Sequence, residues 1–129
     1  ESALSRLLTQ LPKDYEIVIL DIPPTLTPAL GAAISAADQI FVPVSQSLHS
    51  LRGLIQLRKA TDKPIIAVAI GEVNYEELSS VLDVAILRSE EVEIAASSSL
   101  SVLTLSKSSE VSESYRSAAY SILEILGLE

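Results

Sequence analysis

Short runs rich in Ile, Val and Leu, separated by stretches with helical spacing, limit the folds open to this chain. Residues 16–22 (EIVILDI) are nearly continuous in apolar side chains, which is typical of a strand buried on both faces of a parallel sheet. Similar runs occupy residues 39–44 and 64–70, and weaker ones occupy residues 83–87 and 101–105. This alternation predicts an α/β fold with three layers, αβα, and a mainly parallel sheet of about four or five strands.

Helix signals fill the stretches between these runs. Leucines recur at helical spacing before Pro12, Thr27 precedes Pro28 as a cap residue, and Gly127 follows the last periodic stretch. We therefore expect helices over residues 4–11, 28–37, 48–60, 74–81, 89–96 and 109–126.

Composition narrows the classes of protein that remain. The 129 residues are about one domain in length and 48% are hydrophobic, which excludes intrinsic disorder and predicts a single domain over residues 1–129. A net charge of −8 argues against direct contact with nucleic acid. The absence of cysteine and the single histidine exclude disulfides, thiolate metal sites and multi-histidine centres.

No apolar run approaches the roughly 20 residues of a membrane span. The sequence also has no basic segment followed by the apolar stretch of a signal peptide. We expect a cytoplasmic location without direct membrane insertion.

Asp21 is the best candidate acid in the chain. It ends the first predicted strand, and ligands bind at the carboxyl ends of strands in open α/β sheets. In nucleotide hydrolases such a carboxylate holds magnesium through water. The alternative is a turn residue whose carboxylate caps backbone N–H groups before Pro23 and Pro24.

Three spaced segments carry a resemblance to a known family. Residues 21–26 (DIPPTL), 36–44 (AADQIFVPV) and 48–54 (LHSLRGL) resemble the Walker B and switch II region of the MinD/ParA family of deviant P-loop ATPases. Residues 89–95 and 112–116 are similar to the C-terminal portion of that family, so the resemblance covers nearly the whole chain. It implies a P-loop NTPase fold that is incomplete here.

The resemblance also implies which residues meet a nucleotide. Asp21, Pro23, Pro24 and Thr25 would contact it, and Asp21 would bind Mg²⁺ through water and be the one catalytic candidate in an ATPase. ATP and Mg²⁺ are expected only if a half carrying the Walker A loop completes the site. The chain alone is expected to bind no cofactor.

The expected phosphate-binding loop does not occur in these residues. That loop ends in Gly-Lys-Ser/Thr because glycine lets backbone N–H groups crowd around phosphate oxygens. The four glycines are Gly31, Gly53, Gly71 and Gly127, and none of them precedes a lysine.

The base-recognition positions depart from the family pattern as well. Gly71 stands where related ATPases often have an asparagine that reads adenine, and Leu87 with Arg88 replaces a usual proline. A glycine offers no side-chain donor or acceptor to a base. Both changes weaken the expectation of adenine recognition.

Three functional hypotheses follow. The first is a MinD/ParA-like module without a phosphate loop, which acts by protein–protein interaction in intracellular positioning or assembly. The alternative is the C-terminal part of an ATP-hydrolysing MinD/ParA-type ATPase, and whether this chain serves an enzyme therefore stays open. The third is an engineered fragment with no function beyond folding.

A missing central strand has a structural consequence under each hypothesis. In the family the phosphate-loop strand neighbours the strand that carries Asp21, so its absence would leave residues 17–22 as an unpaired apolar edge. We therefore expect a homodimer or a partner protein. We expect no general-base or metal role for His49, which has no acid partner within reach in the sequence. Arg52 is expected to face solvent, and the alternative is that it faces a partner subunit.

Overall fold

A computed structural model describes residues 2–23, 25, 27–74, 78 and 80–128. The chain divides into two compact units, Glu1–Ile40 and Phe41–Glu129. Whether the whole chain behaves as one domain stays a prediction.

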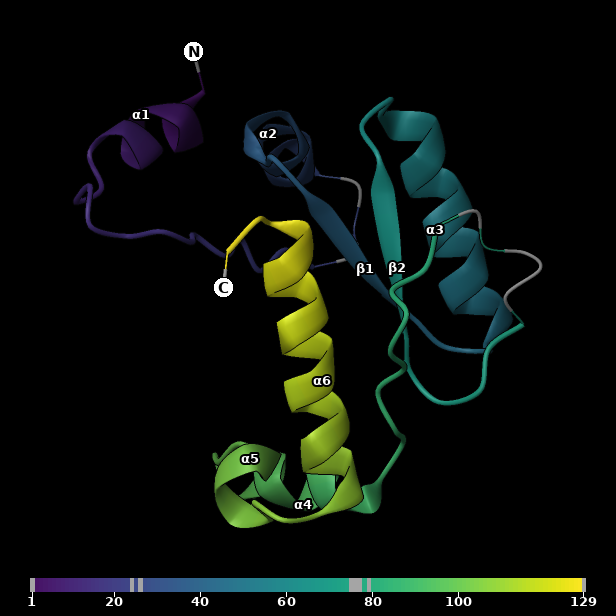
Figure 1. The fold of residues 1–129 in the computed structure, drawn as a ribbon. Coiled ribbons are helices and arrows are strands. Elements are labelled where there is room, and N and C mark those ends of the chain that lie inside the picture. The colour runs from purple at the N-terminus through teal and green to yellow at the C-terminus, as the bar shows by residue number, and fades with distance from the viewer. Residues whose placement is uncertain (1, 24, 26, 75–77, 79, 129) are drawn as a thin grey trace. The chain divides into compact units, whose positions relative to one another are not determined.

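The first unit contains two helices in contact with each other, α1 (Ala3–Thr9) and α2 (Pro28–Ala36) (Figure 1). The Thr27 hydroxyl accepts a hydrogen bond from Leu30 N at 3.3 Å, and Pro28 occupies the first turn of α2. Both features stabilise a helix start, because they satisfy or remove backbone donors that have no partner within the helix. The two predicted helices are thus confirmed, with α1 ending before Pro12.

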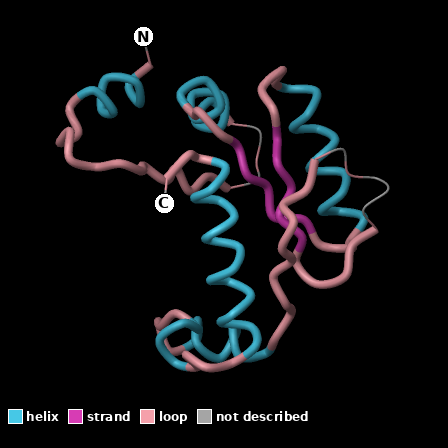
Figure 2. Tube along the Cα trace, in the orientation of Figure 1, coloured by secondary structure: helices cyan, strands magenta, loops and turns pink. Residues whose placement is uncertain are grey.

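The predicted strand over residues 16–22 does not form. Residues 17–22 lie in irregular chain (Figure 2), and no hydrogen bond joins their backbone to another described residue. Ile17, Val18 and Ile19 are 39%, 48% and 85% exposed. The prediction of a strand is wrong because a strand needs a neighbouring strand to pair its N–H and C=O groups, and the described residues offer none here.

The second unit is built on a two-stranded parallel sheet, β1 (Ile40–Val44) and β2 (Ile65–Ala69), connected by α3 (Leu48–Ala60). Two of the predicted strands are thereby confirmed. The predicted sheet of four or five strands is wrong for the described residues. Beyond β2 the described residues add two isolated parallel bridges, Ala67 with Val81 and Ile70 with Ile86. The predicted strand over 83–87 is thus reduced to the second bridge.

Pro43 sits within β1 and lacks a backbone N–H. The carbonyl of the next residue, Val44, accepts a hydrogen bond from Ile70 N at 2.9 Å and so faces β2. Because backbone polar groups alternate between the two edges of a strand, the missing donor of Pro43 belongs to the edge that faces away from β2.

Helices lie on opposite sides of this sheet. Figure 1 places α3 on one side of the two strands and α6 (Glu110–Ile125) on the other. On the α6 side, Val68 and Ala118 belong to one buried apolar cluster together with Leu82 and Ile86. Successive strand residues point to opposite faces, so Ala67 and its alternate neighbours in β2 face the other side. No described helix is both long and apolar enough to cross a bilayer.

The predicted strand over 101–105 is also wrong, because this stretch forms a short helix, α5 (Val102–Leu105). The Ser101 hydroxyl accepts a hydrogen bond from Leu103 N at 3.1 Å and caps the turn. Val102 is buried in a cluster with Ala95 of α4 (Glu90–Ser97) and Val111 of α6. Local capping and helix packing therefore outweigh the β-prone composition of this stretch.

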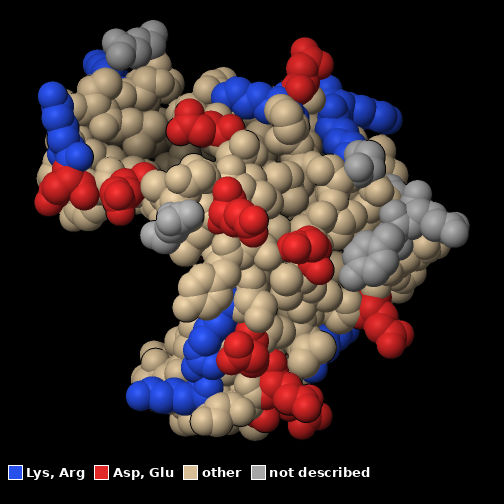
Figure 3. All heavy atoms as spheres, viewed as in Figure 1, with Lys and Arg blue, Asp and Glu red and all other residues tan. Residues whose placement is uncertain are grey.

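The fully buried hydroxyl of Ser112 joins α5 to α6. It donates to Val102 O at 3.1 Å and to Ser106 O at 2.6 Å, and it accepts from the Ser109 hydroxyl at 3.0 Å. Nearby, Arg116 pairs with Glu113 at 3.1 Å, and Figure 3 shows basic and acidic side chains beside each other at this end of the unit.

The remaining helix predictions divide in two. Those over 89–96 and 109–126 are confirmed by α4 and α6, and Gly127 has the positive φ, 73°, that suits the position after a helix. The helix over 74–81 is not seen in its described residues, and Val81 is in a bridge. Residues 75–77 and 79 of that prediction lie outside the described residues.

We expect Leu54→Ala to lower the free energy of unfolding by about 2–5 kcal/mol, because Leu54 of α3 is only 2% exposed and its truncation leaves a cavity. The neighbouring Ile55 is 52% exposed, so Ile55→Ala is the matched control and should cost under about 1 kcal/mol. Urea unfolding measures both. Equal losses would contradict the placement of α3.

Candidate functional site

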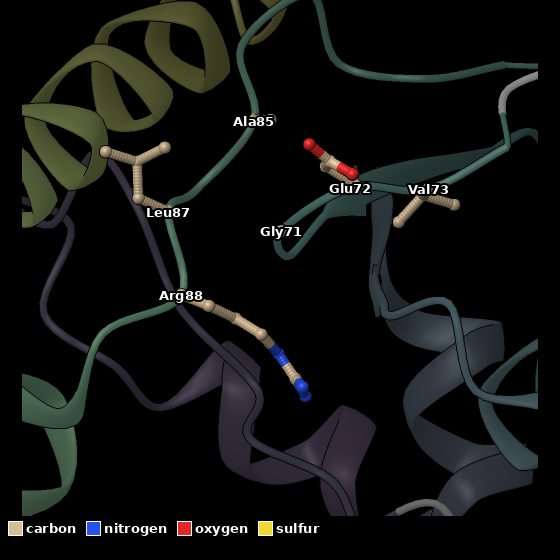
Figure 4. Close-up of a pocket in the computed structure, with 6 residues that line it drawn as sticks. All are labelled: Gly71, Glu72, Val73, Ala85, Leu87 and Arg88. Atoms are coloured by element: carbon tan, nitrogen blue, oxygen red, sulfur yellow. The ribbon is translucent and has the colours of Figure 1, made fainter.

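The second unit has a hollow at the end of β2. It is widely open to solvent, has a volume of about 660 Å³ and is lined by Gly71, Glu72, Val73, Ala85, Leu87 and Arg88 (Figure 4). We call it the edge pocket. Residues 71–73 lie in the loop after β2. The other three lining residues flank Ile86, which forms a parallel bridge with Ile70 at the end of β2. The edge pocket therefore lies at the carboxyl end of parallel pairing, where open α/β sheets bind ligands.

Backbone hydrogen bonds hold the two walls of the edge pocket together. Gly71 N donates to Ile86 O at 2.8 Å, and Ile86 N donates to Ala69 O at 2.8 Å. On the far wall, Leu87 N donates to the Ser114 hydroxyl of α6 at 3.1 Å. Strand, bridge and helix therefore all contribute hydrogen bonds to the backbone that lines the pocket.

Gly71 is at a position that suits glycine. Its φ is +72°, and a Cβ there would meet Cγ and Cδ of Arg88 at 3.3 Å. The aliphatic part of Arg88 thus lies against the backbone of Gly71. This close approach and the positive φ both disfavour a side chain at this position.

Two charged groups line the edge pocket, and they point apart. Figure 4 shows the Glu72 carboxylate on the Ala85 side of Gly71 and the Arg88 guanidinium on the other side. In the part of the chain that the structure describes, neither group has an ion-pair partner. The pocket thus has an acceptor on one side of Gly71 and a set of donors on the other, and its walls are mostly apolar.

A second hollow of about 490 Å³ adjoins this pocket, because Glu72 and Val73 line both. Its other lining residues are Gln46, after β1, and Asn74. Asn74 N donates to the Gln46 side-chain oxygen at 2.8 Å, and this hydrogen bond links the loop after β2 to the loop after β1. The Ser50 hydroxyl of α3 accepts from Ser45 N at 3.0 Å and holds the same loop.

The site residues predicted from the sequence lie in the other unit. Asp21, Pro23 and Thr25 are exposed and belong to irregular chain, whereas Pro24 lies outside the described residues. The prediction that Asp21 ends a buried strand is therefore wrong, because that strand is not formed. The roles of all four in nucleotide binding stay predictions.

The fit of ATP and Mg²⁺ to this chain is partial. Mg²⁺ commonly uses one or two carboxylates together with substrate phosphates, and Asp21 is one exposed carboxylate able to take part. Among the described residues, no group of three or more acidic, histidine or cysteine side chains is placed to hold a metal. None of the four glycines is followed by the lysine of a phosphate loop, and whether the chain binds a triphosphate stays a prediction.

Sequence reasoning missed the Glu72 carboxylate and the link between Gln46 and Asn74. Their positions could have indicated them, because Gln46 follows the predicted strand over 39–44 and both Glu72 and Asn74 follow the predicted strand over 64–70. Arg52 of α3 is exposed, as expected, and His49 of the same helix is exposed as well.

A family model described as an AAA domain matches residues 1–70, more than half of the chain. The chain belongs to this family of AAA domains, which is of the ParA/MinD type. It is 29% identical over 117 residues to the ParA family protein MG470 of Mycoplasma genitalium, a match that covers 84% of this chain and 43% of that relative. It is 30% identical over 61 residues to a ParA family protein of Mycoplasma pneumoniae, covering 47% of this chain and 23% of the relative.

The matched regions thus span less than half the length of these curated relatives. No solved structure matches the chain.

Gly71→Ala should destabilise the second unit by roughly 1–2 kcal/mol, because alanine is strained at a positive φ and its Cβ would crowd the Arg88 side chain. The control is Gly53→Ala in the middle of α3, where nothing lies within 4 Å of the new Cβ. That change should stabilise the protein by about 0.5–1 kcal/mol. Thermal unfolding reports both, and the same sign for the two variants would contradict the geometry at Gly71.

Proposed function

We propose that this chain is a ParA-type module that acts through contact with another polypeptide strand, in intracellular positioning or assembly. One observation carries the proposal: residues 17–20 are β-prone, their backbone has no hydrogen-bond partners among the described residues, and the side chains of Ile17, Val18 and Ile19 are exposed. Such a segment is a template for strand addition. Family membership supports the ParA-type part of the proposal.

The partner strand is most simply that of a second copy of the chain. Pairing of residues 17–20 with their counterparts would satisfy backbone groups on both chains and cover the three exposed aliphatic side chains. The proposal therefore predicts a dimer. It requires no basic surface, which agrees with the net charge of −8.

We expect the chain to be a dimer in light scattering at micromolar concentration, and Ile19→Lys to be a monomer. Ile19 is 85% exposed, so the substitution removes little packing within the chain and adds a charge at the proposed contact. Leu7→Lys in α1, where Leu7 is 61% exposed, is the control and should leave the dimer intact. A wild-type chain that is monomeric throughout would rule out this pairing.

A second candidate function is nucleotide hydrolysis by a larger ParA-type assembly in which this chain supplies part of the site. The observation that favours it is that Asp21 lies inside the region that matches the AAA domain model. The phosphate-binding loop would have to come from polypeptide outside these 129 residues. Mg²⁺, when bound, would neutralise phosphate charge, and Asp21 would hold it through water.

Titration with a fluorescent ATP analogue and Mg²⁺ separates these candidates. The module alone should show no saturable binding of the triphosphate in the micromolar range, because it has no loop to cradle phosphates. Asp21→Ala is the matched variant. Micromolar binding that Asp21→Ala abolishes would overturn the first proposal in favour of the second.

A further inference from the structure

One side of α3 carries a regular line of exposed side chains. Leu48, Arg52, Ile55 and Lys59 follow one another at steps of four, three and four residues, so they share one side of the helix. Leu48 is 63% exposed and Ile55 is 52% exposed, and the two basic residues are exposed as well. We call these four residues the α3 stripe. Leu54 is buried, so the helix packs against its own unit through a different side.

The α3 stripe is basic within an acidic chain. The 13 residues of α3 include no Asp or Glu, whereas the whole chain has a net charge of −8. In the ranges that the structure describes, neither Arg52 nor Lys59 has a carboxylate at ion-pair distance. Figure 3 shows basic side chains beside one another over the part of the second unit where α3 ends. The stripe therefore presents positive charge that the chain itself does not neutralise.

The spacing of the α3 stripe is that of a coiled-coil seam, in which alternate steps of three and four residues face a partner helix. Here one seam position holds the aliphatic residues Leu48 and Ile55, and the other holds Arg52 and Lys59. Two such stripes would pair poorly, because each would bring cations and no carboxylate to the contact. A suitable partner must supply both aliphatic side chains and acidic ones.

We propose that the α3 stripe docks an acidic amphipathic α-helix of a partner protein. Aliphatic residues of that helix would cover Leu48 and Ile55, and its carboxylates would pair with Arg52 and Lys59. The inference goes beyond the proposed strand pairing at residues 17–20, because it assigns a second kind of partner to a different surface.

Other anionic partners suit the α3 stripe less well. A nucleic acid backbone offers phosphates but no aliphatic side chains for Leu48 and Ile55, and a net charge of −8 opposes its approach. An anionic lipid surface binds helices whose apolar face is wide and enters the headgroup boundary, whereas the stripe has one aliphatic residue per turn or less. Helical spacing on both partners satisfies the apolar and the charged residues together.

The test uses the full chain and a labelled synthetic helix of about two heptads, with leucine at one seam position and glutamate at the other. Fluorescence anisotropy follows binding. We expect saturable binding with a Kd of roughly 10–500 μM, because a contact of three turns is small, and we expect salt to weaken it. The same peptide with lysine in place of glutamate should bind at least about tenfold more weakly.

Charge-reversal variants locate the contact. Arg52→Glu combined with Lys59→Glu should weaken binding of the glutamate peptide by about tenfold or more and strengthen binding of the lysine peptide. Lys13→Glu combined with Lys107→Glu makes the same change in net charge at exposed residues outside α3, so binding should change by no more than about twofold. Ile55→Gln should weaken binding by about tenfold without any change in charge.

Three results would overturn the inference. They are no saturable binding of the glutamate peptide, equal binding of a peptide with the same residues in scrambled order, and equal losses in the two charge-reversal pairs. Binding of duplex DNA or of anionic phosphatidylglycerol vesicles that displaces the peptide from α3 would also overturn it. The dimer test at Ile19 is separate. A dimer that binds no peptide would refute this inference alone, and a monomer that binds the peptide would refute the strand pairing alone.

Discussion

The sheet of the second unit depends on β2 being hydrogen-bonded along both of its edges. On one edge Ile70 N reaches Val44 of β1, and on the other Ala67 accepts from Leu82 N while Ala69 accepts from Ile86 N. These bonds allow the most deeply buried stretch of the chain to leave water without losing its backbone partners. The same bonds hold the walls of the edge pocket, so the core and the candidate site share one framework.

Residues 17–20 show what happens where that condition is not met. Their composition resembles that of β2, yet Ile19 is 85% exposed while Ala69 is fully buried. Apolar composition predicts that a segment can be a strand, but a strand forms only where another strand supplies donors and acceptors. The sequence of one segment does not contain that information, which is why the prediction for residues 16–22 failed and those for β1 and β2 succeeded.

Local signals predicted the helices well. Thr27 and Ser109 each accept a hydrogen bond from a backbone N–H in the first turn of the helix that follows, and such capping depends only on near neighbours in the sequence. At α5 the local signals conflict. Ser101 caps a helix in the same way, whereas the valine and leucine residues that follow it favour the strand that was predicted there. For the site, the family resemblance draws attention to Gly71, Leu87 and Arg88 as departures from the usual pattern, and the structure finds all three in the lining of the edge pocket. The position of the Glu72 carboxylate depends on where a turn directs its side chain, which the sequence pattern does not show.

Pro43 gives β1 two unlike edges. The edge toward β2 keeps its donors, whereas the opposite edge has lost one, so a strand arriving there would find an interrupted ladder. Indefinite stacking of sheets from many molecules requires an unbroken row of donors and acceptors on each exposed side. A single proline thus makes this edge of the sheet a poor starting point for fibrous aggregation. A single neighbouring strand could still pair there if it needs no donor from residue 43.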